Sequence, residues 1–256
     1  CGPGLSVQDQ GRPGYLEQGL SVSGAADPLA LLEGSALLGH AIPRASIEMA
    51  GMGGKFEAQT DQRIALTGAV MPSTIDGVHI AWNASHFLPK GAVLSIGGAQ
   101  RGIYGYLSFG GGISTLPFLG SRSAHLRAGV SRSLQSGDII PTGEDTERET
   151  GLELELSDRL GGGLIRTVPS VQSALFSPAQ HQRFEEATFT RSTRGNRMGV
   201  ALEFEGQGFA ANGQLSILSE IIVPGDIQMT GDGRPFVLLP ECQTTGGYPR
   251  IATVIP

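Results

Sequence analysis

Short runs of alternating apolar and polar residues, rather than a helical repeat, dominate this chain. Residues 152–156 and 200–205 alternate aliphatic or aromatic side chains with glutamate, which predicts half-buried strands. Asp-Gly stands between the two apolar arms of 74–80, and this pair favours the tight turn of a hairpin. Further strands are predicted at 63–69, 92–96, 103–109, 164–169, 215–223 and 236–239.

Capping signals predict two helices. Residues 27–39 begin with Asp-Pro, an N-cap before a proline at the first helical position, and end at glycine. Leu29, Leu32 and Ala36 recur there at helical spacing, which predicts a short amphipathic helix packed on its apolar side. Residues 177–186 open with a Ser-x-x-Gln capping box. The expected fold class is therefore mainly β with two or three short helices.

Glycine is the most unusual feature of the composition. The 256 residues include 39 glycines and 15 prolines, while 39% are hydrophobic and only 16% are charged. Such a chain can bury a sizeable core, and it should turn often between short strands. The acidic stretch 143–151 and the glycines 161–163 enclose a predicted strand, which indicates a surface hairpin or a boundary between subdomains. We favour a boundary near 160, with β subdomains at 1–160 and 161–256.

Charge and apolar runs exclude several classes of protein. The net charge of −6 argues against binding of nucleic acid as a main role. No apolar run reaches the ~18 residues of a membrane-spanning helix, and the first residues lack the basic and apolar regions of a secretory leader. Cys1 and Cys242 have no spacing for a disulfide framework or a metal site. A cytoplasmic protein without a structural metal is expected.

Several familiar catalytic motifs are missing from the sequence. Gly54-Lys55 is followed by Phe56, where a phosphate-binding loop needs serine or threonine. No Gly-x-Ser-x-Gly elbow occurs and the five histidines are scattered, which disfavours a serine hydrolase and a histidine-based metal site. The carboxylates of 144–149 lack the glycine and distal glutamate of a calcium loop, so a solvated loop is the favoured interpretation.

The most informative segment is 241–250, which reads Glu-Cys-Gln-Thr-Thr-Gly-Gly-Tyr-Pro-Arg after a predicted apolar strand. Two hydroxyls, an amide, a phenol and a guanidinium are concentrated in it. Adjacent glycines can direct backbone N–H groups at an oxygen anion as a nest, and threonine hydroxyls can add donors. The segment therefore predicts a site for a carboxylate, a phosphate or a ureido group, with a plain glycine turn as the alternative.

Three other polar loops border predicted strands, at 7–15, 194–200 and 219–228. They and the segment 241–250 contribute the charged residues Asp9, Arg12, Arg197, Glu220 and Arg250. This protein has few charged residues, yet several of them are concentrated in a few glycine-containing loops. One shared site for a small polar ligand is a simpler explanation than several unrelated surface positions. We therefore expect the loops of the second subdomain to converge, with Asp9 and Arg12 nearby.

Eight ordered segments carry a resemblance that covers essentially the whole chain. They are Gln8-Asp9-x-Gly11-Arg12-x-Gly14-Tyr15, Ser23-Gly24-Ala25-x-Asp27, Leu66-Thr67-Gly68-Ala69, Gly111-Gly112-Ile113, Leu119-Gly120-Ser121-Arg122-Ser123, Arg197-Met198-Gly199, Val223-Pro224-Gly225-x-Ile227-Gln228 and Gln243-Thr244-Thr245-Gly246-Gly247-Tyr248-Pro249. With these motifs the chain resembles the C-type component of bacterial 5-oxoprolinase. This biotin-dependent carboxyltransferase-like family is also called allophanate hydrolase subunit 2 and is similar to part of urea amidolyase.

The resemblance implies a cyclophilin-like β-barrel that acts with a B-type partner protein. Together with an A-type partner, the pair is expected to open 5-oxo-L-proline to glutamate at the expense of ATP. In the urea amidolyase relatives, the corresponding site transfers a carboxyl group from carboxybiotin to urea. Some relatives are described as antagonists of a kinase inhibitor. The alternative to an enzyme component is therefore a non-catalytic binding module that sequesters a B-type partner.

Both chemistries need hydrogen-bond donors aimed at developing oxyanions. By resemblance, the catalytic donors are Gln243, Thr244, Thr245 and Arg197. The substrate-binding residues are Asp9, Arg12, Glu220, Gly246, Gly247, Tyr248 and Arg250. Tyr248 either stacks on a flat ring or is a core tyrosine with a satisfied hydroxyl.

The sequence departs from the family pattern at three positions. Ile221 replaces a common glycine beside Glu220, and Cys242 stands where histidine, arginine or glutamine is more usual. Arg250 takes a position that is more often lysine, which keeps the charge but cannot provide a neutral base. The family pattern is also expected to continue beyond residue 256.

Overall fold

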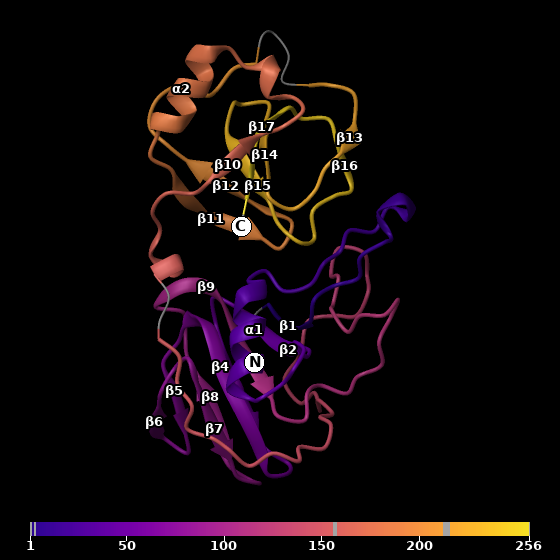
Figure 1. Cartoon of the computed structure of the whole chain (residues 1–256), viewed down its shortest axis with the longest axis vertical. Helices are drawn as coiled ribbons and strands as arrows, with labels where there is room; N and C mark the ends of the chain where they lie inside the picture. The colour runs from indigo at the N-terminus through magenta and orange to yellow at the C-terminus, as the bar shows by residue number, and fades with distance from the viewer. Residues whose placement is uncertain (1, 3, 156–157, 212–215, 256) are drawn as a thin grey trace. The chain divides into compact units, whose positions relative to one another are not determined.

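The structure is a computed structural model that describes residues 2, 4–155, 158–211 and 216–255. It is mainly β, as predicted, and it divides into two compact units (Figure 1). Unit 1 comprises residues 1–12 and 23–163, and unit 2 comprises 13–22 and 164–256. The segment 13–22 thus belongs with the C-terminal part of the chain, where the Ser21 hydroxyl donates to the Pro240 carbonyl at 3.3 Å. The predicted single boundary near 160 does not account for this segment, because residues 13–22 precede the boundary but belong to unit 2.

Unit 1 is built from two antiparallel sheets in its described residues. The five-stranded sheet has the order β1 (Leu5–Gln8), β2 (Ser46–Ala50), β9 (Arg101–Phe109), β4 (Gln62–Val70) and β7 (Ala84–Leu88). The four-stranded sheet has the order β3 (Lys55–Glu57), β8 (Val93–Ile96), β5 (Ser73–Ile75) and β6 (Val78–Ile80). Ile64 and Leu66 of β4 join Leu94 of β8 in the main core, so the two sheets pack face to face.

The helix α1 (Pro28–Leu37) covers the other side of the large sheet. Its Asp27 side chain accepts from the Ala30 amide at 3.2 Å, so the predicted N-cap is confirmed. The predicted apolar face is wrong, because Leu29 and Leu32 are 46% and 50% exposed. The packed face consists of Ala30, Leu31, Gly34, Ser35 and Leu37. Small residues there allow close approach to the sheet, and periodicity could not identify this face because α1 is apolar on both sides.

Most predicted strands of unit 1 are confirmed, including the hairpin β5–β6, whose turn residues Asp76 and Gly77 have φ of 47° and 83°. Of the alternating segment 152–156, the described residues 152–155 are not a strand. Glu153 forms one isolated bridge with Ala84, and residues 156–157 lie outside the described chain. Backbone hydrogen bonds nevertheless join residues 151–154 to residues 83–85, for example from the Leu154 amide to the Asn83 carbonyl at 2.8 Å. The segment therefore lies along the edge of β7 without forming a regular ladder. A short 3₁₀ helix, η2 (Asp158–Gly161), follows this segment.

The acidic loop 143–151 is held on unit 1 rather than solvated throughout. Both oxygens of Asp145 accept from Arg63, each at 2.8 Å, and Arg63 also donates to the Glu149 carbonyl at 3.0 Å. The prediction of a fully solvated loop is therefore wrong for Asp145, because a buried arginine on β4 needs a carboxylate partner.

Unit 2 contains a six-stranded antiparallel sheet and a separate two-stranded ribbon in its described residues. The sheet order is β10 (Thr167–Pro169), β17 (Arg250–Val254), β14 (Asp226–Met229), β15 (Pro235–Leu238), β12 (Gly199–Glu203) and β11 (Thr190–Asn196). The ribbon pairs β13 (Glu220–Ile221) with β16 (Thr245–Gly246). The predicted strand 164–169 is thus limited to Thr167–Pro169. Of 215–223, residue 215 is not described, and only Glu220 and Ile221 are strand.

The described residues of unit 2 also form the short helices η1 (Leu16–Gln18), η3 (Ser173–Leu175) and α2 (Pro178–Glu186), of which α2 packs on an aromatic core. The Ser177 side chain accepts from the Gln180 amide at 3.3 Å, which confirms the predicted cap of α2. Phe184 of α2 packs on Phe209 and Phe189 in this core. No helix in the described ranges is both long and apolar enough to cross a membrane.

Candidate functional site

The threonine-glycine loop of 241–250 is fixed in unit 2 by backbone pairing. Thr245 and Gly246 pair with Ile221 and Glu220 across the ribbon β13–β16. The Ile222 amide donates to the Thr244 carbonyl at 3.1 Å, and the Ile217 amide donates to the Gly247 carbonyl at 2.8 Å. Two of the predicted polar segments, 219–228 and 241–250, are therefore neighbours in the structure.

The two glycines of this loop serve close approach rather than a nest. A Cβ at Gly246 would lie 2.6 Å from Nε2 of Gln228, and a Cβ at Gly247 would lie 3.0 Å from the Ile217 carbonyl oxygen. Neither glycine has a positive φ, although a nest alternates right- and left-handed residues. The predicted nest at these positions is wrong, because the ribbon holds Gly246 extended.

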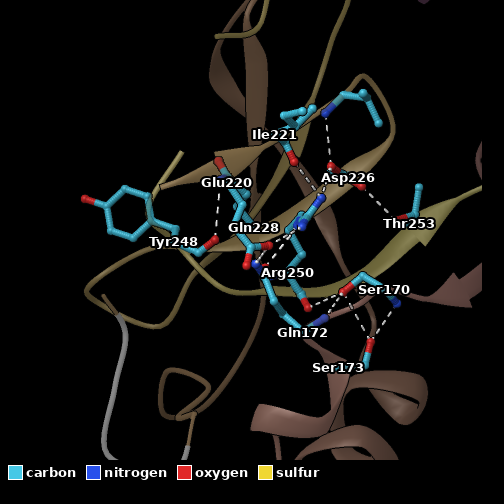
Figure 2. A network of polar contacts seen from close by, with 11 residues as sticks. Ser170, Gln172, Ser173, Glu220, Ile221, Asp226, Gln228, Tyr248, Arg250 and Thr253 are labelled. Atoms are coloured by element: carbon cyan, nitrogen blue, oxygen red, sulfur yellow. Dashed lines mark hydrogen bonds and ion pairs between the residues drawn. The ribbon is translucent and has the colours of Figure 1, made fainter. Parts of the chain in front are cut away.

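Beneath the ribbon, Arg250 is the centre of a buried polar network (Figure 2). Its Nη1 donates to Oδ2 of Asp226 at 3.1 Å and to the Ile221 carbonyl at 3.0 Å. Its Nη2 donates to Oε2 of Glu220 at 3.2 Å, and its Nε donates to Oε1 of Gln172 at 3.0 Å. A guanidinium with four internal acceptors is committed to the fold, so Arg250 orients Glu220 and the ribbon.

Further hydrogen bonds tie this network to the large sheet of unit 2. The Thr253 hydroxyl donates to Oδ1 of Asp226 at 2.7 Å, and the Val223 amide donates to Oδ2 at 3.0 Å. The Ser170 hydroxyl donates to the Arg250 carbonyl at 2.6 Å. Asp226 is therefore saturated by donors at the start of β14, and its position is set from three directions (Figure 2).

A second buried ion pair fixes the other end of the loop. Nε of Arg197, in the turn between β11 and β12, donates to Oε1 of Glu241 at 2.6 Å, and the two side chains are 8% and 3% exposed. The Glu241 amide donates to the Arg197 carbonyl at 2.8 Å. The third predicted segment, 194–200, therefore contacts the residue where the threonine-glycine loop begins.

The side chains that reach solvent in this region are neutral or acidic. Gln243, Thr245 and Tyr248 are exposed and Thr244 is half-buried. The Tyr248 ring points away from Arg250, and its 45% exposure does not fit the alternative of a core tyrosine (Figure 2). Glu220 presents a half-exposed carboxylate beside the same ribbon. These groups form a surface with donors and an acceptor, backed by two buried arginine–carboxylate pairs.

Asp9 and Arg12 belong to unit 1 and are built into its 118–123 loop. Asp9 accepts from the amides of Gly11 and Arg122 and from the hydroxyls of Ser121 and Ser123, at distances from 2.5 to 2.8 Å. Burial alone would raise the pKa of Asp9, but these hydrogen bonds outweigh it and hold the pKa below the ordinary 3.8. Arg12 is fully buried and donates to carbonyls of Phe118 and Ser123. Their predicted proximity to the loops of unit 2 stays a prediction.

Cys242 lies next to Glu241 but is not arranged as a nucleophile. Burial, and to a smaller extent the charge of Asp226, raises the pKa of its thiol to about 11. The thiol therefore stays protonated near neutral pH. Within the described residues no group of three or more histidine, cysteine or acidic side chains could hold a metal ion.

Sequence reasoning missed Gln172, Asp226 and Glu241 as members of the site. Asp226 and Glu241 had a usable signal in the sequence, because each is an acid beside an apolar run, and the segment of Glu241 also contains Arg250. Gln172 had none, since it lies in an irregular segment 78 residues from its partner Arg250. Only the fold brings such a residue to the network.

Comparisons with known proteins agree on the family of this mainly β chain. The chain belongs to the family described as carboxyltransferase domain, subdomain A and B, which matches residues 18–256. The resemblance to the C-type component of 5-oxoprolinase is likewise confirmed by named relatives.

The C subunit of 5-oxoprolinase from Escherichia coli is 33% identical over 98% of this chain and 81% of its own length. The protein of the same name from Haemophilus influenzae is 34% identical with the same coverage. Urea amidolyase of Saccharomyces cerevisiae is 27% identical over 78% of this chain but only 12% of its own length.

Solved structures show the same fold. The crystal structure of TTHA0988 has a TM-score of 0.87 and 29% identity, and it covers 98% of this chain. This chain spans about half of the TTHA0988 chain, or 49%. The K. lactis urea amidolyase matches with a TM-score of 0.84 over 99% of this chain and 17% of its own, at 24% identity.

Proposed function

We propose that this chain is the C-type component of an ATP-dependent 5-oxoprolinase that acts with B-type and A-type partners. The observation that carries the proposal is the identity of 33% and 34%, over nearly the whole chain, to two proteins named as the C subunit of 5-oxoprolinase. The reaction is 5-oxo-L-proline, ATP and water giving L-glutamate, ADP and phosphate. In this proposal unit 2 is the cyclophilin-like subdomain that carries the site.

The chemistry explains why such a site needs donors. The ring amide is stabilised by resonance, so phosphorylation of its oxygen would convert it into a better electrophile with a good leaving group. Water would add to the phosphorylated carbon, and the C–N bond would break with the ring nitrogen taking a proton, which gives an acyl phosphate. A second water would attack this acyl phosphate, negative charge would develop on the carbonyl oxygen before phosphate leaves, and fixed hydrogen-bond donors would stabilise that charge. Among the predicted catalytic residues, Gln243, Thr244 and Thr245 are the ones whose side chains reach solvent and can donate.

In this proposal the buried arginines position the site and do not contact the substrate. Arg197 and Arg250 each contact carboxylates inside unit 2, so we assign them to positioning of the loop and of Glu220 rather than to direct contact with substrate. Glu220 would accept from the substrate, and Tyr248 would cover one face of the ring. Gly246 contributes by letting the ribbon lie close to Gln228, and Gly247 by letting the loop lie close to the Ile217 carbonyl.

Reconstitution tests the proposal. The chain is mixed with the B-type and A-type proteins of its own organism, and ADP and L-glutamate are measured with 5-oxo-L-proline present. We expect turnover only with all three proteins and none with this chain alone. Omission of this chain should abolish glutamate formation, and turnover that persists without it would refute the assignment.

A carboxyltransferase component of a urea amidolyase system is the second candidate, favoured by the family description and by the yeast relative. Its test replaces 5-oxo-L-proline with urea and adds a biotinylated carrier protein, which would supply the carboxyl group. Urea-dependent ATP turnover without 5-oxoproline-dependent turnover would select this candidate. Tight binding to the B-type protein with no turnover on either substrate would select the binding module instead.

A further inference from the structure

Unit 1 contains a polar cavity that the proposed function does not use. Its volume is about 430 Å³, within the range of small-molecule sites. Three of the segments that carry the family resemblance, 8–15, 111–113 and 119–123, contribute to its lining. Segments that are far apart in the sequence therefore meet at one cavity.

Two arginines line this cavity and have donors to spare. Nε of Arg122 donates to the Thr115 carbonyl at 2.8 Å, and Nη1 of Arg44 donates to the Gly110 carbonyl at 3.2 Å. Within the ranges that the structure describes, neither guanidinium forms an ion pair with a carboxylate or any further hydrogen bond. By contrast, carboxylate partners are present for Arg63, Arg159, Arg197 and Arg250.

The wall of the cavity is shaped to receive these side chains. Gly112 has φ of +67°, and a Cβ there would lie 2.8 Å from Cδ of Arg44, so glycine lets the arginine stem lie against the turn. On the opposite segment, Oδ2 of Asp9 accepts from the Arg122 amide at 2.6 Å and fixes its backbone.

Asp9 is the acidic residue that lines the cavity, and hydrogen-bond donors of the protein already stabilise its negative charge. Its oxygens accept from four donors of unit 1, which disperse the negative charge that would otherwise oppose an anion. Two guanidinium groups and one saturated carboxylate leave the cavity with a net positive charge. Guanidinium groups bind planar carboxylates and phosphates through paired hydrogen bonds.

We propose that this cavity binds a small anion with a carboxylate or phosphate group, held by the guanidinium groups of Arg44 and Arg122. This site lies wholly within unit 1, and it is independent of the proposed function of unit 2. The shared chemistry is an oxyanion that can accept two or more hydrogen bonds.

Isothermal titration of the whole chain at constant ionic strength tests the site, with inorganic phosphate and glutarate as separate probes. We expect saturable binding of at least one probe at one site per chain. Arg44→Gln and Arg122→Gln should each weaken it by about tenfold or more, because each removes a charged donor pair. Arg122→Lys should recover only part of the affinity, because it keeps the charge but loses the fork geometry.

Arg148→Gln is the matched control, because it removes the same charge from an exposed side chain of unit 1 that does not line this cavity. It should change the affinity by less than about twofold. Saturation by phosphate alone or glutarate alone identifies the anion class. Saturation by neither, or an equal loss in the control, overturns the proposal. If Arg122→Gln fails to fold, the exposed Arg44 gives the same test.

Discussion

The cavity arginines of unit 1 and the network arginines of unit 2 differ in what balances their charge. In unit 2, Arg197 and Arg250 are buried against carboxylates. Arg197 ties the β11–β12 turn to the start of the threonine-glycine loop, and Arg250 ties β17 to β14. In unit 1, Arg44 and Arg122 line a cavity, and each guanidinium donates one hydrogen bond to a carbonyl among the described residues. A guanidinium whose donors are occupied positions backbone, whereas one with donors to spare can hold a ligand. An arginine in a motif therefore indicates a ligand only after its partners inside the protein are known.

The largest effect should come from breaking the network of unit 2. Arg250→Ala leaves the 3%-exposed Asp226 side chain buried without its guanidinium, and we expect a loss of about 3–5 kcal/mol in the free energy of unfolding. Urea denaturation measures it. Arg234→Ala, which removes an exposed ion pair with Asp232 in the same unit, should cost less than about 1 kcal/mol. Equal losses in the two variants would show that Arg250 is not committed to the fold.

The next effect concerns the surface above that network. Thr245→Val removes a hydroxyl from the exposed edge of the ribbon while keeping the side-chain shape, so folding should be nearly intact. The loss of one oxyanion donor typically costs ~3 kcal/mol in the transition state, or about a hundredfold in turnover of the reconstituted complex. Thr193→Val, at an exposed position of β11, is the matched control and should retain the rate. A rate for Thr245→Val that equals the control would remove this threonine from the site.

Acid should weaken unit 1 through Asp9. The folded pKa of Asp9 is lowered, so its contribution to stability is present above the unfolded carboxyl pKa and is lost as pH falls through the folded pKa. Asp9→Asn should therefore cost about 1–3 kcal/mol near neutral pH, where it replaces a charged acceptor of four hydrogen bonds. Thermal unfolding from pH 7 to pH 3 should show this deficit shrink at the acid end. A deficit that stays constant over that range contradicts the assignment.

The smallest effect on activity is expected at Cys242. With its thiol pKa raised to about 11, roughly one molecule in a thousand carries the thiolate at pH 8. Alkylation of Cys242, followed by peptide mass spectrometry, should be at least about a hundredfold slower in the folded chain than in denaturant. Cys242→Ala should leave the turnover of the complex within about twofold. Rapid alkylation together with loss of turnover would identify a nucleophile instead.

Local signals in the sequence predicted much of the fold because their physical causes are local. Asp27 and Ser177 accept hydrogen bonds from amides three residues later, and Asp76-Gly77 has the positive φ values of a tight turn. Long apolar runs such as β4 and β9 were recognised because a central strand is buried for most of its length. The prediction failed at 152–155, where the backbone hydrogen-bonds to the edge of β7 but forms only one bridge and no regular ladder.

The sequence alone determined the family, the mainly β class, the capped helices and the neighbouring polar segments of unit 2. The tertiary structure decided what those polar residues do, because charge compensation depends on residues that are distant in sequence. Arg250 contacts Gln172 across 78 positions, and Asp9 contacts Ser123 across 114. The tertiary structure also decided that Gly246 and Gly247 allow close packing and do not form a nest. The reason is that the neighbours of a backbone atom, and so the space around it, depend on the fold.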